Sequence, residues 1–175
     1  MNKLLIVVDY QKDFVDGSLG FAGAEMLDEV IAAKVQQYQA AGDKVVVTMD
    51  THEADYLRTQ EGRRLPVRHC QRDTEGWCVY GQTAELVEDC RAFEKPTFGS
   101  AALFDYLRNS ACFEQIELCG LVSNMCVLSN AVLAKCAQPE VPIVIDASAC
   151  AAPDPAMHKA ALQVLAGLQI EIINK

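Results

Sequence analysis

Apolar runs of strand length alternate with helix-patterned segments along the whole chain, and this alternation limits the folds that it can form. The runs at residues 4–8 and 45–48 are continuous, as in strands buried on both faces. Further strands are predicted at 91–93, 115–119, 141–145 and 170–173, and helices at 24–41, 101–107, 124–137 and 155–166. Strand and helix in alternation predict βαβ units, and hence an α/β fold with an open parallel sheet covered on both faces.

The chain shows no linker of shifted composition and no internal repeat, so we expect a single domain over residues 1–175. Residues 51–90 have little periodicity and are rich in charged residues, Gly and Pro. A loop of that length in a compact domain is usually functional.

The charge balance narrows the range of partners. The sequence has 24 acidic against 15 basic residues, a net charge of −9, and an acidic surface repels nucleic acid and anionic lipid. No apolar run approaches the roughly 20 residues that span a bilayer. Because the first apolar run is interpreted as a strand rather than a signal peptide, we expect a cytoplasmic protein that binds neither nucleic acid nor membranes.

The eight cysteines include no C-x-x-C pair, and without an export signal most are expected to be reduced, buried hydrophobes. Cys119 is expected within a strand, Cys136 late in a helix and Cys150 in a loop. Cys126 differs, because a strand, a tight polar turn and the start of a helix surround it. Free N–H groups and the positive helix end lower the pKa of a thiol at such a place and can stabilise an oxyanion.

Asp9 and Lys95 follow the first and third predicted strands, at the edge where parallel sheets bind ligands. With the Cys126 thiolate as nucleophile, an acid to carry the proton and a lysine to balance charge, the three residues predict covalent acyl transfer. Taken singly, each has another interpretation. Asp9 can be a cap or loop acid, Lys95 a solvated surface charge, and Cys126 a structural residue.

A second group of polar residues closes the second strand. Asp50 and His52 are two residues apart and face the same side of an extended chain, and His69 follows across the long loop, with Glu61 before it. Carboxylate and imidazole ligands suit Zn²⁺, Mn²⁺ or Fe²⁺. The alternative is a hydrogen-bonded pair that fixes a loop. His158 has no ligand-like neighbour and is expected to be structural or exposed.

Three motifs in this order resemble the isochorismatase-like cysteine hydrolases, and within them the nicotinamidase branch. They are D-x-Q-x-D-F at residues 9–14, the lysine Lys95, and G-L-V-S-N-M-C ending at Cys126. The resemblance covers essentially the whole chain. It implies a Rossmann-like sheet of six strands in the order 3-2-1-4-5-6 and a catalytic triad of Asp9, Lys95 and Cys126. It also implies a cis peptide bond between Leu121 and Val122, with the N–H groups of Val122 and Cys126 forming the oxyanion hole.

The resemblance also implies a divalent transition metal, zinc first and manganese or iron as alternatives. Its ligands would be Asp50, His52 and His69, with Glu61 as a further ligand in some members. This chain departs from the branch where an aromatic residue usually encloses the pyridine ring, because Leu65 is the nearest equivalent. The expected pocket residues are Phe14, Leu65, Trp77 and Phe98.

The expected function is therefore a metal-dependent cysteine amidohydrolase that cleaves a small carboxamide, nicotinamide first, to acid and ammonia. The nearest alternative is a metal-free member of the same family acting on an N-carbamoyl or ureido amide or an isochorismate-like compound. A catalytically silent binding domain is a further alternative, against which the intact set of Asp9, Lys95 and Cys126 argues. Family members commonly self-associate, so a homo-oligomer is expected.

Overall fold

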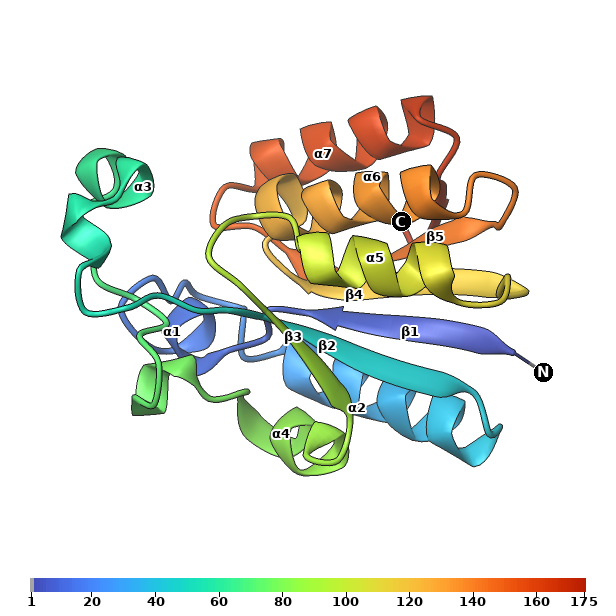
Figure 1. Cartoon of the computed structure of the whole chain (residues 1–175), viewed down its shortest axis with the longest axis horizontal. Helices are drawn as coiled ribbons and strands as arrows, with labels where there is room; N and C mark the ends of the chain where they lie inside the picture. The colour runs from blue at the N-terminus through green and yellow to red at the C-terminus, as the bar shows by residue number, and fades with distance from the viewer. Residues whose placement is uncertain (1) are drawn as a thin grey trace.

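The computed structural model describes residues 2–175 and contains one six-stranded parallel sheet (Figure 1). The strand order is β3-β2-β1-β4-β5-β6, so the predicted fold class and strand order are confirmed. The strands are β1 (Lys3–Val8), β2 (Lys44–Asp50), β3 (Arg91–Lys95), β4 (Gln115–Leu121), β5 (Ile143–Ala151) and β6 (Glu171–Ile173).

Helices cover both faces of the sheet (Figure 1). On one face lie α2 (Leu27–Ala40) and α4 (Gly81–Val87), and on the other α5 (Ala101–Asn109), α6 (Leu128–Ala137) and α7 (Pro155–Gly167). Two short helices, α1 (Lys12–Val15) and α3 (Gln60–Arg64), lie beyond the carboxyl ends of the strands. No helix among residues 2–175 is long and apolar enough to cross a membrane.

The centre of the sheet is the core of the molecule. Residues 4–8 of β1 are at most 1% exposed, and burying each such aliphatic side chain stabilises the fold by about 1.5–3 kcal/mol. Close packing of β1 against β4 depends on Gly120. Its φ is +114°, and a Cβ at this position would collide with the carbonyl oxygen of Val8. Gly120 thus allows close pairing with Val8, the last residue of β1, directly before Asp9.

Several strand boundaries differ from those predicted, those of β3 and β5 among them. β3 extends to Lys95 rather than ending at residue 93, and β5 spans residues 143–151 rather than 141–145. The end of β5 is built from small residues that lack the β-branched signal, and it pairs with β4 after a register shift. Cys150 pairs with Gly120 there and is buried, so the prediction that it lies in a loop was wrong.

The segment 51–90 holds more structure than its lack of periodicity indicates. It contains α3, α4 and two 3₁₀ turns, η1 (Tyr56–Arg58) and η2 (Glu75–Trp77). The α4 helix begins where Gln82 and Thr83 donate backbone hydrogen bonds to the Asp28 carboxylate, 54 and 55 residues away. No local sequence pattern predicts the start of a helix whose cap comes from another element.

Candidate active site

Asp9, Lys95 and Cys126 meet at the carboxyl edge of the sheet. Lys95 is the last residue of β3, Asp9 directly follows β1, and Cys126 lies in η3 (Ser123–Val127), a π-helical turn that leads into α6. The Lys95 ammonium lies 2.6 Å from Asp9 Oδ2 and 3.5 Å from Cys126 Sγ. Thr48 donates a hydrogen bond of 2.6 Å to the other Asp9 oxygen. All three members are buried, so their charges act on one another in a medium of low polarity.

The electrostatics of this cluster differ from the sequence-based expectation. Burial raises the pKa of the Cys126 thiol well above its usual 9.0, and the negative charge of Asp9 raises it further, while Lys95 lowers it. The predicted lowering of this pKa by a helix end is not found, because burial of the thiol is the largest effect and acts in the opposite direction.

The partners of the thiol carry opposite charges. Burial lowers the pKa of Lys95, but the negative charges of Asp9 and Asp50 and the hydrogen bond to Asp9 act against it, so its net shift is upward and the ammonium persists. Burial raises the pKa of Asp9 above 3.8, against the lowering effect of Lys95. The cluster thus places a proton acceptor and a fixed cation beside a neutral nucleophile.

The second group of polar residues lies next to the first. One ligand atom from each of Asp50, His52 and His69 lies within 4.8 Å of the others, and all three residues are buried. Glu61 Oε1 lies 3.8 Å from Nε2 of each histidine. Lys95 joins the two groups, because its ammonium also lies 3.5 Å from Asp50 Oδ1.

Backbone pairing brings His69 to His52. After β2 the chain makes a further parallel bridge between His52 and Gln71, in which His52 N–H donates to Cys70 and its carbonyl accepts from Arg72. His69 Nδ1 lies 2.8 Å from the Val67 carbonyl oxygen, which turns Nε2 toward Asp50. A ring nitrogen held in this way is the usual support of a metal-binding histidine.

The D-x-Q-x-D-F motif is explained by contacts across this edge. Gln11 donates from its amide to the carbonyl of Asp50 and accepts from the Asp50 N–H, both within 2.9 Å. Asp13 accepts a hydrogen bond of 2.6 Å from the Cys70 N–H. Asp9 pairs with Lys95, so each polar residue of the motif fixes one part of the site.

Tyr56 is a site residue that the sequence analysis missed. Its buried ring lies 4.5 Å from the His52 ring and 5.0 Å from the His69 ring, measured between centroids. Its hydroxyl donates to the Leu65 carbonyl. An aromatic residue four positions after His52 was the only available signal, and one aromatic residue in a long loop is weak evidence of contact.

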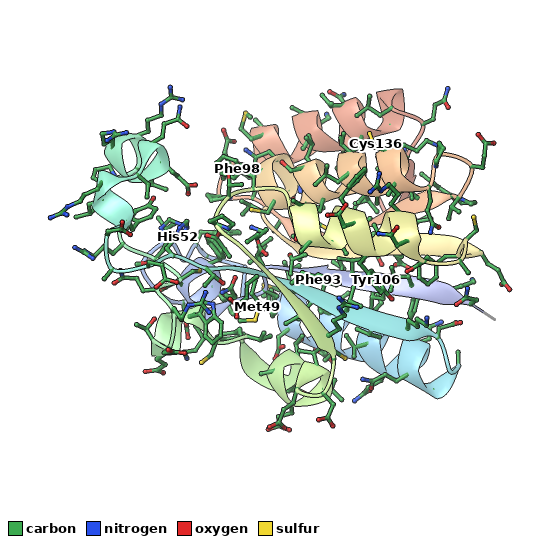
Figure 2. All side chains as sticks on the ribbon, viewed as in Figure 1. Met49, His52, Phe93, Phe98, Tyr106 and Cys136 are labelled. Carbon is green, nitrogen blue, oxygen red and sulfur yellow. The ribbon has the colours of Figure 1, made fainter. Side chains whose placement is uncertain are left out.

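A cavity of about 450 Å³ opens beside both groups, between α3 and the loop after β3. Leu65 and Phe98, two of the expected pocket residues, line it together with Met125 and Glu61. Figure 2 shows His52 and Phe98 at the end of the sheet from which α3 projects. The exposed Met125, directly before the nucleophile, was not expected in this role.

The other two expected pocket residues lie elsewhere. Trp77 does not line this cavity, and its indole N–H donates to the Thr51 hydroxyl. Phe14 packs its ring 5.7 Å from that of His69, on the side of the metal-ligand candidates. The structure therefore divides the four residues between the cavity and the support around the histidines.

The turn before Cys126 contains the cis peptide bond that the family resemblance implies. It joins Leu121 to Val122. Within residues 2–175, the Val122 N–H donates no hydrogen bond. Asn130 of α6 donates to the Cys126 carbonyl at 2.8 Å, which holds the later part of the turn.

Comparison with known proteins assigns this arrangement to a family. The family model of the isochorismatase domain matches residues 3–174. The chain belongs to the isochorismatase family. It is 32% identical over 145 residues to an uncharacterized isochorismatase family protein, PncA, of Bacillus subtilis, covering 75% of this chain and 78% of the relative.

Solved structures of isochorismatase-family proteins share the whole fold. The crystal structure of the nicotinamidase/pyrazinamidase PncA from Bacillus subtilis superposes with a TM-score of 0.87 at 30% identity, covering 98% of this chain and 99% of that one. The pyrazinamidase of Pyrococcus horikoshii in complex with zinc is 22% identical, with a TM-score of 0.85 and full coverage of both chains. At that identity the second match shows the fold alone.

The donor set of this isochorismatase-family hydrolase fits a divalent transition metal. Two imidazole nitrogens and one or two carboxylate oxygens are available from Asp50, His52, His69 and Glu61. That mixture suits zinc, manganese or iron better than magnesium or calcium, which favour oxygen ligands.

Proposed function

We propose that this isochorismatase-family enzyme is a metal-dependent cysteine amidohydrolase that hydrolyses nicotinamide to nicotinate and ammonia through a Cys126 thioester. The observation that carries the proposal is the position of Lys95. Its ammonium contacts the Asp9 carboxylate, the Cys126 sulfur and Asp50 of the metal-ligand set. A nucleophile, its base and a metal-binding group thus surround one ammonium group, and the residues Glu61 and Met125 beside them line the cavity.

In the first half-reaction Asp9 accepts the Cys126 proton while Sγ attacks the carboxamide carbon. The carbonyl electron pair moves to oxygen, and the N–H groups of Val122 and Cys126 stabilise the oxyanion. When the carbonyl re-forms, the C–N bond breaks and the amine leaves as ammonia with the proton that Asp9 held. Lys95 keeps its proton and balances the charge of Asp9.

In the second half-reaction a water attacks the thioester and gives a proton to Asp9. The C–S bond breaks, the acid leaves, and Asp9 returns its proton to Cys126. The sum consumes one amide and one water and releases one acid and one ammonia. Every proton transfer uses Asp9, the buried carboxylate whose ion pair with Lys95 lies beside the thiol.

Asp50, His52 and His69, with Glu61 as a further ligand, would hold the metal. Bound there, the metal supplies a coordination position for the pyridine nitrogen, which orients the ring in the cavity. Leu65, Phe98 and Met125 provide apolar contacts for the rest of the substrate, as expected of a small-molecule pocket.

The test is ammonia release from nicotinamide by the purified chain, before and after removal of metal and after return of zinc, manganese or iron. Metal content per chain is measured in parallel for the wild type and for His52→Ala. We expect about one metal ion per wild-type chain, turnover that disappears with the metal, and loss of both in the variant. The matched control is His158→Asn, whose metal content should equal that of the wild type.

Two outcomes would redirect the proposal. Turnover of an N-carbamoyl or ureido amide without metal would favour the metal-free alternative within the family. Metal binding without turnover of nicotinamide, while Cys126 still reacts with iodoacetamide, would retain the cysteine chemistry and overturn the substrate.

A further inference from the structure

The turn that carries the nucleophile is joined to α7 by a partly buried side-chain hydrogen bond. Ser123 Oγ lies 2.7 Å from His158 Nδ1. Ser123 is the first residue of η3, directly after Val122 and three residues before Cys126. His158 lies in the first turn of α7 and is partly buried. The proposed chemistry leaves this contact without a role.

The pair does not have the properties of a second nucleophilic centre. Ser123 is 1% exposed, so its hydroxyl is closed to a substrate. No carboxylate among residues 2–175 forms an ion pair with His158, and burial alone lowers the pKa of the ring below its usual 6.5. A neutral ring without an orienting acid suits a fixed hydrogen-bond partner rather than a catalytic base.

Among the described residues, side chains from other elements form hydrogen bonds with both ends of η3. Asn130 of α6 donates to the Cys126 carbonyl, and Lys95 reaches Cys126 Sγ. At the other end, the Ser123 hydroxyl is held by His158. The carbonyl of Val122 accepts from the N–H groups of Met125 and Val127. Ser123 directly follows Val122, so a hydrogen bond that fixes the Ser123 side chain holds the turn at the residue next to Val122.

We propose that His158 is a positioning residue that acts through Ser123 to align the Val122 N–H with Cys126. The inference rests on the proposed acyl-transfer function, but it concerns a residue on a helix outside the catalytic group. His158 touches neither the substrate cavity nor the metal-ligand set. Its loss should therefore lower the rate of the chemical step and leave substrate binding and metal binding unchanged.

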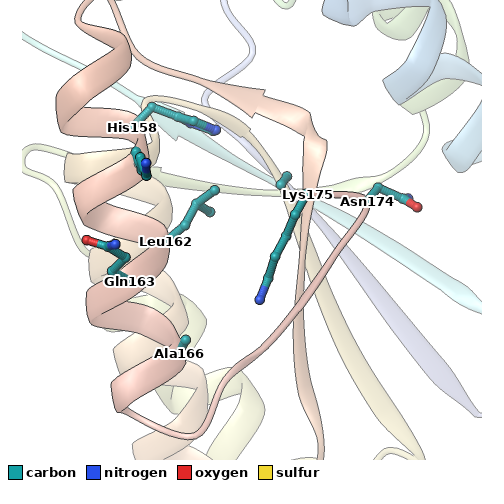
Figure 3. Close-up of a pocket in the computed structure, with 8 residues that line it drawn as sticks. His158, Leu162, Gln163, Ala166, Asn174 and Lys175 are labelled. Carbon is teal, nitrogen blue, oxygen red and sulfur yellow. The ribbon is translucent and has the colours of Figure 1, made fainter.

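The surroundings of His158 allow this idea to be tested with single substitutions. The residue lines a cavity of about 490 Å³ between α7 and the last residues of the chain. Figure 3 shows Leu162 and Ala166 of α7 facing Asn174 and Lys175 across it. Because there is free space beside the ring, a side chain of similar or smaller size can replace it without a collision.

Three variants separate the hydrogen bond from the packing. His158→Leu removes the bond, His158→Asn retains a polar atom near the position of Nδ1, and Ser123→Ala removes the other partner. Leu162→Ala is the matched control, because it weakens the packing of the same helix one turn away without touching Ser123. Thermal unfolding of every variant shows which of them fold as the wild type does.

Two acyl donors and one alkylating agent are compared. Nicotinamide reports on the proposed reaction, and 4-nitrophenyl acetate needs only the thiol and the oxyanion site. Iodoacetamide reacts with Cys126 by displacement at carbon without forming an oxyanion, so its rate reports on the nucleophile alone.

We expect His158→Leu and Ser123→Ala each to lower kcat for both acyl donors between about 10-fold and 100-fold, the effect of a misplaced oxyanion donor. KM, metal content and the alkylation rate should stay within about 2-fold of wild type. His158→Asn should recover most of the rate. The double variant should be no slower than the slower single one, because both changes break the same bond.

The opposite results would overturn the inference. Wild-type kcat in a folded His158→Leu variant would show that the bond does not align the turn. An equal loss of kcat in Leu162→Ala, or an equal loss of the alkylation rate in His158→Leu, would show that the effect comes from the packing of α7 and not from the hydrogen bond. Failure of the wild type on nicotinamide, with ester hydrolysis that depends on His158, would overturn only the proposed substrate. Failure of the wild type on both donors would overturn both proposals.

Discussion

Two lysines in this molecule, one partly buried and one fully buried, each bridge two carboxylates, and they differ in what else lies nearby. Lys34 of α2 lies 2.6 Å from Glu117 of β4 and 2.7 Å from Asp146 of β5. Lys95 of β3 lies 2.6 Å from Asp9 and 3.5 Å from Asp50. The charges of the two clusters are alike, but the Lys34 side chain is 12% exposed against 1% for Lys95. Among residues 2–175, only the second lysine lies within hydrogen-bond distance of a thiol.

The difference is in how completely the carboxylates are satisfied. In the Lys34 cluster all four oxygens have partners, supplied by Lys34 and by the residues Tyr38, Ser148 and Asn174. In the Lys95 cluster Asp9 Oδ2 accepts no hydrogen bond of ordinary geometry beyond its ion pair. A saturated network stabilises a fold, whereas a carboxylate with spare capacity can take a proton.

Substitution of the nucleophile has the largest expected effect among the tests of this comparison. Cys126→Ala should lower kcat by at least about 10⁴-fold, since loss of a catalytic nucleophile removes the covalent route. The free energy of unfolding should change by less than about 1.5 kcal/mol, because one buried sulfur is lost. Ammonia release and urea unfolding measure the two quantities. A folded variant that keeps 1% of the wild-type rate would rule out the thioester.

Substituting each lysine tests whether one cluster serves catalysis and the other serves stability. Lys95→Met should lower kcat by about 10³-fold, because Asp9 without its cation stays protonated and cannot act as a base. Lys34→Met should leave kcat unchanged and cost about 3 kcal/mol or more of unfolding free energy, because it leaves two buried carboxylates unpaired. Both variants are assayed for ammonia release and urea unfolding. Equal losses of kcat in the two variants would show that the two clusters do not differ in their role in catalysis.

The dependence of stability on pH provides a test of the Lys34 cluster with a smaller expected effect. Burial raises the pKa of Asp146, but hydrogen bonds from Lys34, Ser148 and Asn174 lower it more, to below its usual 3.8. A carboxyl group whose pKa is lower when folded stabilises the fold above about pH 4 and loses this contribution as the pH falls further.

Asp146→Asn should therefore cost about 1.5–3 kcal/mol at pH 7, the value of hydrogen bonds to a charged group. The difference from the wild type should shrink below about pH 4. Urea unfolding across this pH range measures it. A difference that grows in acid would contradict the assignment of the charged form to the folded state.

The smallest expected effect concerns the cavity beside the Lys95 cluster. Leu65, 37% exposed, lines this cavity together with Phe98, so Leu65→Trp should enclose an aromatic substrate more fully. We expect KM for nicotinamide to fall about 3-fold, the gain from one aromatic contact, with kcat unchanged. The control is Leu57→Trp, at a residue 39% exposed that lines a different cavity. An equal change in both variants would show that the effect does not come from the pocket.

The sequence by itself determined the sheet and the places of its polar edge residues. Uninterrupted apolar runs ending at Asp9 and before Asp50 are local patterns, and parallel strands bring their carboxyl ends to one edge. For that reason the parallel sheet and the proximity of Asp9, Lys95 and Cys126 agree with the expectation, whereas the strand order was implied by the family resemblance. The assignment to the isochorismatase family rested on motif spacing along the chain.

The tertiary structure decided what depends on burial and on contacts between distant segments. The pKa of Cys126 is raised because the fold removes the thiol from water, which no local pattern records. The cap of α4 by Asp28, the contact of Tyr56 with the histidines and the bond from His158 to Ser123 each join separate elements. Their energies exist only once the chain has folded, because a residue's neighbours in space determine its solvation and hydrogen bonds.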